Sequence, residues 1–387
     1  MPGALGDYQN EIYLQGLGGT TPDLPMAPAE LEAAGLAAMS PEAVGYVAGG
    51  AGAEETVRAN RAAFDRWRIV PRMLRGVDSR DMSTTVLGTA MPAPVLLGPV
   101  GVMEIIHPDC EVAVARAAGP LGVPMILSTA ASTPMEQVAE AGGDAPRWYQ
   151  LYWPRDREVA ASFLRRAEAA GYTAIVVTLD TWLLGWRPRD LARGYLPFLN
   201  GKGIANYTSD PAFRAGLAKP PEEDMQAAIL HWLGMFADPA LTWDDIAWLR
   251  DNTTLPIVLK GILHPDDARQ ALDVGADGMV VSNHGGRQVD GGVAALDALP
   301  RVVDTVAGAV PVLFDSGVRS GADAVKALAL GAKAVLLARP YLYALALGGS
   351  EGVRTFLRSF LADLDINLAL AGYSSPGQLR PDALVRS

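Results

Sequence analysis

A histidine followed by two glycines and an arginine stands in SNHGGRQ, residues 282–288, directly after an apolar run. His284 is one of only four histidines in the chain, and an imidazole at the end of a strand can take a proton from a substrate. Asp180 ends another apolar run, AIVVTLD. Because a carboxylate beside an imidazole orients the ring and stabilises its protonated form, we expect a general-base pair. The alternative is that His284 only holds a loop.

Three basic residues are candidates for holding an anion near that pair. Arg187 and Arg287 follow the same two apolar runs, and two guanidinium groups facing one pocket would bind a small carboxylate bidentately. Lys260 lies between an apolar run and Gly261, where its ammonium could balance an anion that develops during a reaction. The alternatives are surface salt bridges for the two arginines and a salt bridge or a Schiff base for the lysine.

The segment FDSGVRSGADAVKALALGA predicts a phosphate site near the end of the chain. It joins an apolar run to a helical pattern through Gly317, Arg319 and Gly321, and Arg339 ends the next apolar run. Backbone N–H groups, a helix N-terminus and basic residues bind phosphate in many β/α barrels. The segment contains neither GxGxxG nor a P-loop, so it does not indicate a dinucleotide or nucleoside triphosphate.

A closed (β/α)₈ barrel would bring these residues together. Eight short apolar runs alternate with longer alanine-rich segments of helical period, which favours a TIM barrel over an open sheet. The C-terminal ends of the strands of such a barrel converge on one pocket. We expect the strands at residues 94–100, 124–130, 147–153, 174–180, 256–262, 278–284, 311–317 and 334–340.

The remaining segments are predicted to be additions to a single domain that spans residues 1–387. Residues 1–92 would form a helical N-terminal extension that covers the bottom and one side of the barrel, which itself runs over 93–345. Residues 346–387 would form C-terminal helices. The stretch of about 181–255, after the fourth strand, is too long for a simple crossover and predicts a lid insertion over the barrel mouth.

Composition and charge argue against several classes of partner. The 387 residues include 32 lysines and arginines against 43 acidic residues, and this formal net charge of −11 disfavours nucleic acid and anionic membranes. Cys110 is the only cysteine, so we expect no intramolecular disulfide, no thiolate zinc site and no CxxC redox chemistry. We assign no metal-binding residue. No apolar run reaches the roughly 20 residues of a spanning helix, and no secretory signal is visible, so we expect a cytoplasmic protein.

One segment is open to a further interpretation. The apolar stretch DMQAAILHWLGMFADPALTW, residues 224–243, could be a helix that lies on a membrane surface. Its lack of basic residues favours packing in the core or between subunits instead.

Taken in order, these residues closely resemble the family of FMN-dependent 2-hydroxy acid oxidases and dehydrogenases. SNHGGRQ, LKGI, QLYW, TLDT and DSGVRSGADAVKALALGA are similar to motifs of that family, and the similarity spans most of the chain. GDYQNEIYLQGL, YVAGGAG and TLDTWLLGWRPRDL look most like its lactate 2-monooxygenase members.

The resemblance implies a role for each residue. His284 would be the catalytic base with Asp180 as its partner, and Lys260 would stabilise negative charge on the reduced flavin. Arg187 and Arg287 would bind the substrate carboxylate, together with Tyr46 and with Tyr152, which we also place among the catalytic residues. The residues implied to line the flavin ring are Pro99, Val100, Gly101, Ser128, Gln150 and Thr178, those implied to hold the ribityl phosphate are Asp315, Gly317, Arg319 and Arg339, and Ser282 and Ala338 are implied cofactor contacts as well.

The chain departs from the usual family pattern at two positions. Ser316 stands in a motif that is commonly DGGxR, and Ala338 stands where GRP is common. A serine is small and could still donate a hydrogen bond to phosphate. Ala338 adds only a methyl group, which is tolerated unless the backbone there needs a positive φ.

The resemblance implies that an L-2-hydroxy acid, with L-lactate as the first candidate, reduces FMN and that O₂ reoxidises it. We expect a lactate 2-monooxygenase that yields acetate, CO₂ and water, because a lid can keep the 2-oxo acid and peroxide together. The alternatives are an oxidase that releases H₂O₂, a dehydrogenase with another electron acceptor, and a flavin-binding barrel without catalysis. We also expect a homotetramer or a larger homo-oligomer, as is usual in the family.

Overall fold

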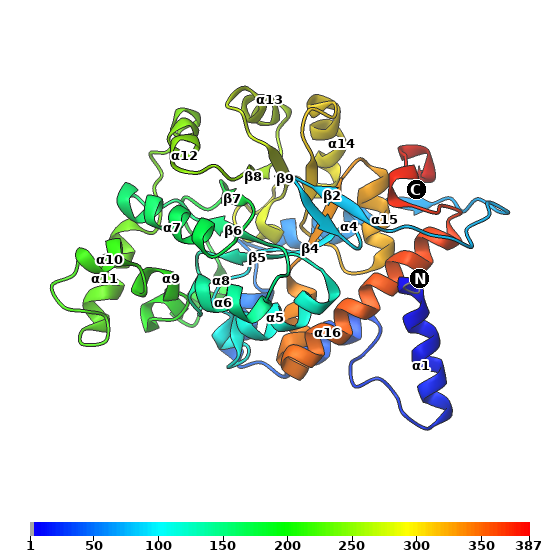
Figure 1. Ribbon diagram of the computed structural model, residues 1–387, viewed down its shortest axis with the longest axis horizontal. Helices are drawn as coiled ribbons and strands as arrows, with labels where there is room; N and C mark the ends of the chain where they lie inside the picture. The colour runs from blue at the N-terminus through cyan, green and yellow to red at the C-terminus, as the bar shows by residue number, and fades with distance from the viewer. Residues whose placement is uncertain (1–3) are drawn as a thin grey trace.

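The computed structural model describes residues 4–387 and contains a closed barrel of eight parallel strands (Figure 1). Each strand pairs with the next one along the chain, and the eighth pairs with the first. The predicted TIM barrel is therefore confirmed. Its strands are β4 (Val95–Leu97), β5 (Met125–Ser128), β6 (Arg147–Leu151), β7 (Ile175–Thr178), β8 (Ile257–Ile262), β9 (Gly278–Val281), β10 (Val312–Phe314) and β11 (Ala334–Leu337).

A helix follows each strand and packs on the outside of the barrel. Local signals set their ends. In α13, for example, His264 accepts a hydrogen bond from the amide of Asp266, Pro265 occupies the first turn, and Gly275 follows with φ 77°. The eight helices are α5 (Cys110–Ala118), α6 (Met135–Gly142), α7 (Arg157–Ala169), α12 (Ile246–Asn252), α13 (Pro265–Asp273), α14 (Ala295–Val306), α15 (Gly321–Ala329) and α16 (Arg339–Leu370).

Alternate strand residues fill the inside of the barrel. Each strand contributes a buried side chain to one apolar cluster, which includes Leu96, Ile126, Trp148 and Val280, while the residues between them face the helices. The hairpin of β2 (Thr84–Val86) and β3 (Thr89–Met91) adds two side chains to the same cluster. The barrel is thus a packed core that is closed at its N-terminal end.

The N-terminal extension is helical, as predicted, and contains three strands as well. Its helices are α1 (Tyr8–Leu17), α2 (Pro28–Ala37), α3 (Pro41–Ala48) and α4 (Glu55–Asp65). Strand β1 (Trp67–Ile69) pairs antiparallel with β12 (Leu384–Arg386), which ties the extension to the end of the chain. The prediction placed the extension at the bottom and one side of the barrel, but α3 lies at the mouth, where Tyr46 and Val47 line a pocket.

The long insertion after β7 forms a small helical unit with its own aromatic core. Its helices are α8 (Pro188–Leu191), α9 (Ala205–Thr208), α10 (Pro211–Ala215) and α11 (Met225–Met235). The rings of Phe198 and Phe236 lie 4.8 Å and 4.6 Å from the ring of Trp232. Because Trp232 is 2% exposed, one face of α11 packs against the protein. Figure 1 shows α9–α11 and α1 at opposite ends of the molecule.

The connections and the C-terminal region complete the chain. Helix α16 is interrupted at Gly348–Gly349 and continues to Leu370. Short 3₁₀ turns occupy connections at η1 (Leu5–Asp7), η2 (Met103–Ile105), η3 (Gly119–Leu121), η4 (Pro197–Asn200), η5 (Trp243–Asp245), η6 (His284–Gly286), η7 (Pro376–Gln378) and η8 (Pro381–Ala383). Among residues 4–387, no helix has the length and apolar character that crossing a membrane requires.

Candidate active site

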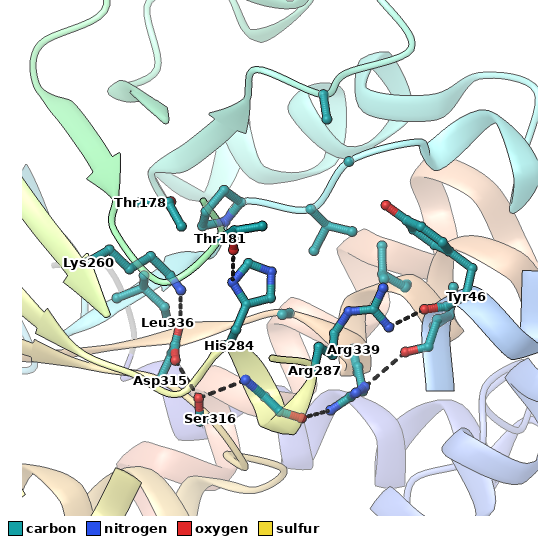
Figure 2. Close-up of a pocket in the computed structure, with 18 of the residues that line it drawn as sticks. Tyr46, Thr178, Thr181, Lys260, His284, Arg287, Asp315, Ser316, Leu336 and Arg339 are labelled. Carbon is teal, nitrogen blue, oxygen red and sulfur yellow. Dashed lines mark hydrogen bonds and ion pairs between the residues drawn. The ribbon is translucent and has the colours of Figure 1, made fainter. Parts of the chain in front are cut away.

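The predicted histidine–aspartate pair forms at the barrel mouth. Nδ1 of His284 lies 2.8 Å from Oδ1 of Asp180, and the hydroxyl of Thr181 lies 3.2 Å from the same nitrogen (Figure 2). Gly261 has φ 113°, and a Cβ there would lie 3.0 Å from the Cβ of Asp180. A glycine in β8 therefore leaves room for the carboxylate that reaches the imidazole.

Electrostatics keep this pair as a carboxylate and a neutral imidazole near neutral pH. Burial acts to raise the pKa of Asp180, but His284, Lys260 and Thr181 together lower the pKa to about 2. Burial lowers the pKa of His284 below its usual 6.5, and the neighbouring Lys260 and Arg187 add to this, against the pull of Asp180. A neutral imidazole can accept a proton.

Two guanidinium groups lie next to the histidine, that of Arg187 buried and that of Arg287 half-buried. Arg187 is 7% exposed; its Nε donates to the carbonyl of Arg287 over 3.1 Å and its Nη2 to Gln288 Oε1 over 2.7 Å. Arg287 donates to the carbonyls of Tyr46 and Gly49 and stacks over the Tyr46 ring at 4.9 Å. Burial, with Arg187 nearby, lowers the pKa of Arg287 to about 9.

The alternative of surface salt bridges is wrong for these arginines. Within residues 4–387, no ion pair involves Arg187 or Arg287. The charge of Asp190 acts on Arg287 from nearby without forming an ion pair with it, and a cation that is withdrawn from water without a paired anion is costly. The two side chains are therefore suited to an anionic ligand.

Lys260 does form a salt bridge, and it is a buried one. Its Nζ lies 3.0 Å from Asp315 Oδ2 and donates to Ser282 Oγ over 2.9 Å. Burial alone would lower the pKa of Lys260, but Asp315 and Asp180 raise it. The side chain is consequently a fixed cation at the barrel mouth. A Schiff base, which requires a neutral amine, is disfavoured.

One pocket gathers most of the predicted site residues, and Figure 2 shows how several of them converge on it. Those in its lining are Tyr46, Pro99, Val100, Gly101, Tyr152, Thr178, Arg187, Lys260, His284, Arg287, Asp315, Gly317, Arg319, Ala338 and Arg339. Asp180 and Ser282 contact the lining residues His284 and Lys260. Ser128 accepts from the amide of Ala130, which is in the lining, and donates to Gln150.

Comparison with known proteins identifies the family. A model of the FMN-dependent dehydrogenase family matches residues 36–386. An FMN-dependent alpha-hydroxy acid dehydrogenase of Penicillium citrinum is 46% identical, covering 100% of this chain and 97% of the relative. The chain belongs to the FMN-dependent 2-hydroxy acid oxidase and dehydrogenase family. The resemblance of the sequence to this family is thus confirmed, with FMN as the cofactor and 2-hydroxy acid oxidation as the class of reaction.

Two other members of this family illustrate its range. An L-lactate oxidase of Lysinibacillus sphaericus is 44% identical, covering 94% of this chain and 93% of the relative. A solved structure of mandelate oxidase with (S)-4-hydroxymandelic acid matches with a TM-score of 0.83 and 39% identity, covering 94% of this chain and 99% of that chain.

The pocket is chemically suited to the flavin ring of FMN. Gln150 Nε2 and Thr178 Oγ1 are buried without a hydrogen-bond partner in the described part of the chain. Both could therefore form hydrogen bonds with the polar edge of a flavin. At Gly101 a Cβ would lie 2.8 Å from the carbonyl oxygen of Ala130. Glycine is therefore required there by the close approach of Ala130, which also lines the pocket.

The predicted phosphate end of the pocket is less open than the sequence suggested. Arg339 donates to the carbonyls of Val47, Gly49 and Gly285 over 2.9, 3.1 and 3.0 Å. Arg319 lies 3.4 Å from Oε2 of Glu32. Both guanidinium groups nevertheless line the pocket, and both remain predicted phosphate ligands of this family member.

The two departures from the family pattern have different outcomes. Ala338 has φ −129°, so the backbone at this position does not adopt the positive φ that would disfavour a methyl group. Ser316 donates its hydroxyl proton to Asp315 Oδ1 over 2.7 Å. In this arrangement the hydroxyl proton is directed to Asp315, and its donation to phosphate stays a prediction.

Gln288 is a site residue that sequence reasoning missed, although it ends the motif SNHGGRQ. Its Nε2 donates to the carbonyls of Asp180 and Leu183 over 2.7 and 2.8 Å. Its Oε1 accepts from Arg187, and from the amide of Gly185 over 3.3 Å. Gln288 thus joins the start of the insertion to the loop that carries His284. Its place directly after Arg287 in the sequence was the signal that could have identified Gln288 as a site residue.

Proposed function

We propose that the protein oxidises L-lactate with O₂ and that it is a lactate 2-monooxygenase, which yields acetate, CO₂ and water. The observation that supports the substrate class is that two guanidinium groups, that of Arg187 buried and that of Arg287 half-buried, lie without an ion-pair partner beside a neutral imidazole. The class of reaction follows from the family. The small acid and the final products are the parts that experiment must decide.

In this proposal each side chain has a separate task. Arg187 and Arg287 bind the substrate carboxylate bidentately, with the phenol groups of Tyr46 and Tyr152 beside it. Burial raises the pKa of both phenols, so they stay protonated and can donate hydrogen bonds. The substrate hydroxyl carbon is then held near His284, where orientation lowers the barrier to reaction.

Proton and charge transfer complete the assignment. His284 Nε2 takes the substrate proton that oxidation releases, and Asp180 stabilises the imidazolium that forms. FMN, when bound, supplies the redox chemistry by accepting two electrons from the substrate and passing them to O₂. Lys260 offers positive charge to the anion that this reduction creates.

The insertion supports the monooxygenase outcome. Leu184, Phe198 and Phe236 belong to it and line the pocket, so the insertion bounds the space in which product forms. If pyruvate and H₂O₂ are held there together, they react to give acetate, CO₂ and water. A lid that opens slowly relative to that step favours the monooxygenase products.

An oxidase that releases pyruvate and H₂O₂ is the second candidate. The 44% identity to an L-lactate oxidase favours it. The side chains of Trp182, Leu183 and Trp186 at the start of the insertion are exposed, so they add little packing over the pocket, which would suit an early release of products.

Two measurements on the flavin-loaded protein test these proposals. L-Lactate added under argon should bleach the flavin absorbance, and D-lactate should not; no bleaching by lactate or by larger L-2-hydroxy acids would contradict catalysis. In air, turnover should yield one acetate and one CO₂ per O₂ consumed. Stoichiometric pyruvate and H₂O₂ would instead establish the oxidase.

We further propose that the protein forms a homotetramer or larger homo-oligomer. The expectation rests on the family alone. Sedimentation velocity of the flavin-loaded protein tests it, and a monomer at micromolar concentration would contradict it.

A further inference from the structure

Ser316 has a backbone conformation that serine rarely adopts. It is the second residue after β10 and has φ 77°, in the left-handed region where a side chain is disfavoured relative to glycine. A glycine is common there in the family pattern described above. A serine kept in this conformation needs interactions of its side chain that offset the strain.

The Ser316 hydroxyl makes three hydrogen bonds in a buried position. The residue is 7% exposed. Its Oγ donates to Asp315 Oδ1 over 2.7 Å and accepts from the amides of Asn283 and Gly285 over 3.2 and 3.0 Å. One donor and two acceptor positions are all that a hydroxyl has, so its hydrogen-bonding capacity is used completely.

These partners belong to two different parts of the candidate catalytic apparatus. Asn283 and Gly285 flank His284, which itself has φ 57°. Asp315 uses its other carboxylate oxygen to pair with Lys260. Figure 2 shows Ser316 between these groups, below the histidine and beside the aspartate. A single hydroxyl therefore connects the backbone of the histidine with the counter-ion of the lysine.

We propose that Ser316 is a positioning residue that holds His284 in its left-handed conformation and orients Asp315 towards Lys260. The inference rests on the proposed role of His284 as the base. The hydrogen bond to Asp315 also withdraws negative charge from that carboxylate. More of the positive charge of Lys260 is then available to the reduced, anionic cofactor.

Two substitutions of Ser316 distinguish the effect of its hydroxyl from the effect of its backbone strain. Ser316→Ala keeps the Cβ and loses the hydroxyl, whereas Ser316→Gly loses both. We expect both variants to keep FMN and to reduce the rate of anaerobic flavin reduction by L-lactate about tenfold to a hundredfold. The thermal midpoint should fall in Ser316→Ala but stay near that of the parent in Ser316→Gly, because glycine removes the strain.

A redox titration of the flavin without substrate gives a second readout. Both variants should show a more negative midpoint potential than the parent protein, because Asp315 then neutralises Lys260 more fully. This measurement does not depend on the identity of the substrate. If L-lactate does not bleach the flavin of the parent protein, the proposed function is contradicted. The shift in midpoint potential tests the link from Ser316 to Lys260 independently of that result.

Ser162→Ala is a matched control. Ser162 is also 7% exposed and donates to a buried aspartate, Asp210, over 2.7 Å, but it does not line the pocket. It should lose stability without any change in flavin potential or reduction rate. Unchanged rate and potential in both Ser316 variants would overturn the inference. Loss of FMN from Ser316→Gly would overturn it too, since the serine would then act as a cofactor ligand.

Discussion

Nδ1 of His284 lies 2.8 Å from Oδ1 of Asp180, although 104 residues separate the two in the chain. Since Nδ1 faces a carboxylate, it carries the ring proton, and Nε2 is left as the basic nitrogen. The contact thereby selects the tautomer that a general base needs. It also aims the imidazole, because Asp180 is itself held by Thr181 over 2.9 Å.

Replacing the imidazole should stop the reductive half-reaction and leave the cofactor in place. We expect His284→Ala to reduce the rate of flavin bleaching by L-lactate at least about a thousandfold, with full FMN content. His264→Ala is the control, because this histidine is exposed at the start of α13. A His284→Ala protein without flavin would show that the residue serves the cofactor instead.

Asp180→Asn tests the partner without changing its shape. The neutral amide can no longer stabilise an imidazolium, so we expect flavin reduction to slow by about two to four orders of magnitude. The apparent pKa of the base should move further down, because the carboxylate raises it in the parent protein. Stopped-flow reduction measured across pH checks both effects, and a base pKa that stays in place would separate Asp180 from the proton transfer.

The pH dependence of kcat/KM should have an acidic limb. The imidazole must be neutral to accept a proton, so activity falls as the pH drops through the lowered pKa of His284, below 6.5. Steady-state rates with L-lactate across the acidic range check this. A kcat/KM that stays constant down to the pH at which the protein unfolds would contradict it.

Gln288→Ala should loosen the start of the insertion. It removes hydrogen bonds to Arg187, Leu183 and Gly185, so we expect KM for L-lactate to rise about tenfold. If the insertion retains product, the ratio of H₂O₂ to acetate should rise as well. Gln137→Ala, at an exposed position on α6, should change neither. An unaltered KM and product ratio would mean that Gln288 does not hold the lid.

Thr89→Val tests the β2–β3 hairpin, which closes the N-terminal end of the barrel. The indole N–H of the fully buried Trp148 donates to the Thr89 hydroxyl over 2.9 Å, and valine leaves that donor unpaired. We expect a loss of about 1–3 kcal/mol in the free energy of unfolding, with no change in the rate of flavin reduction. Urea unfolding measures it. Thr89→Ser should restore stability, and Thr85→Val, at an exposed position of β2, is the control.

The sequence alone determined the barrel and the chemical character of its mouth. Eight apolar runs correspond to β4–β11, because a strand and an amphipathic helix each have a short-range period that neighbouring residues carry. Residues that end parallel strands of one barrel must meet at one rim. The approach of Asp180 to His284 and the gathering of Arg187, Arg287 and Lys260 could therefore be predicted from their places in the chain.

Only the tertiary structure decided what the loops and the extension contribute. The prediction put the extension at the bottom and one side of the barrel, yet the C-terminal end of α3 lies at the mouth, where the carbonyl of Gly49 accepts from both Arg287 and Arg339. The hydroxyl of Ser316 likewise donates to Asp315, a contact that the sequence did not indicate. Loops lack the hydrophobic periodicity that identifies strands and helices in a sequence. The hydrogen-bond partner of a hydroxyl depends on groups that distant segments bring within about 3 Å.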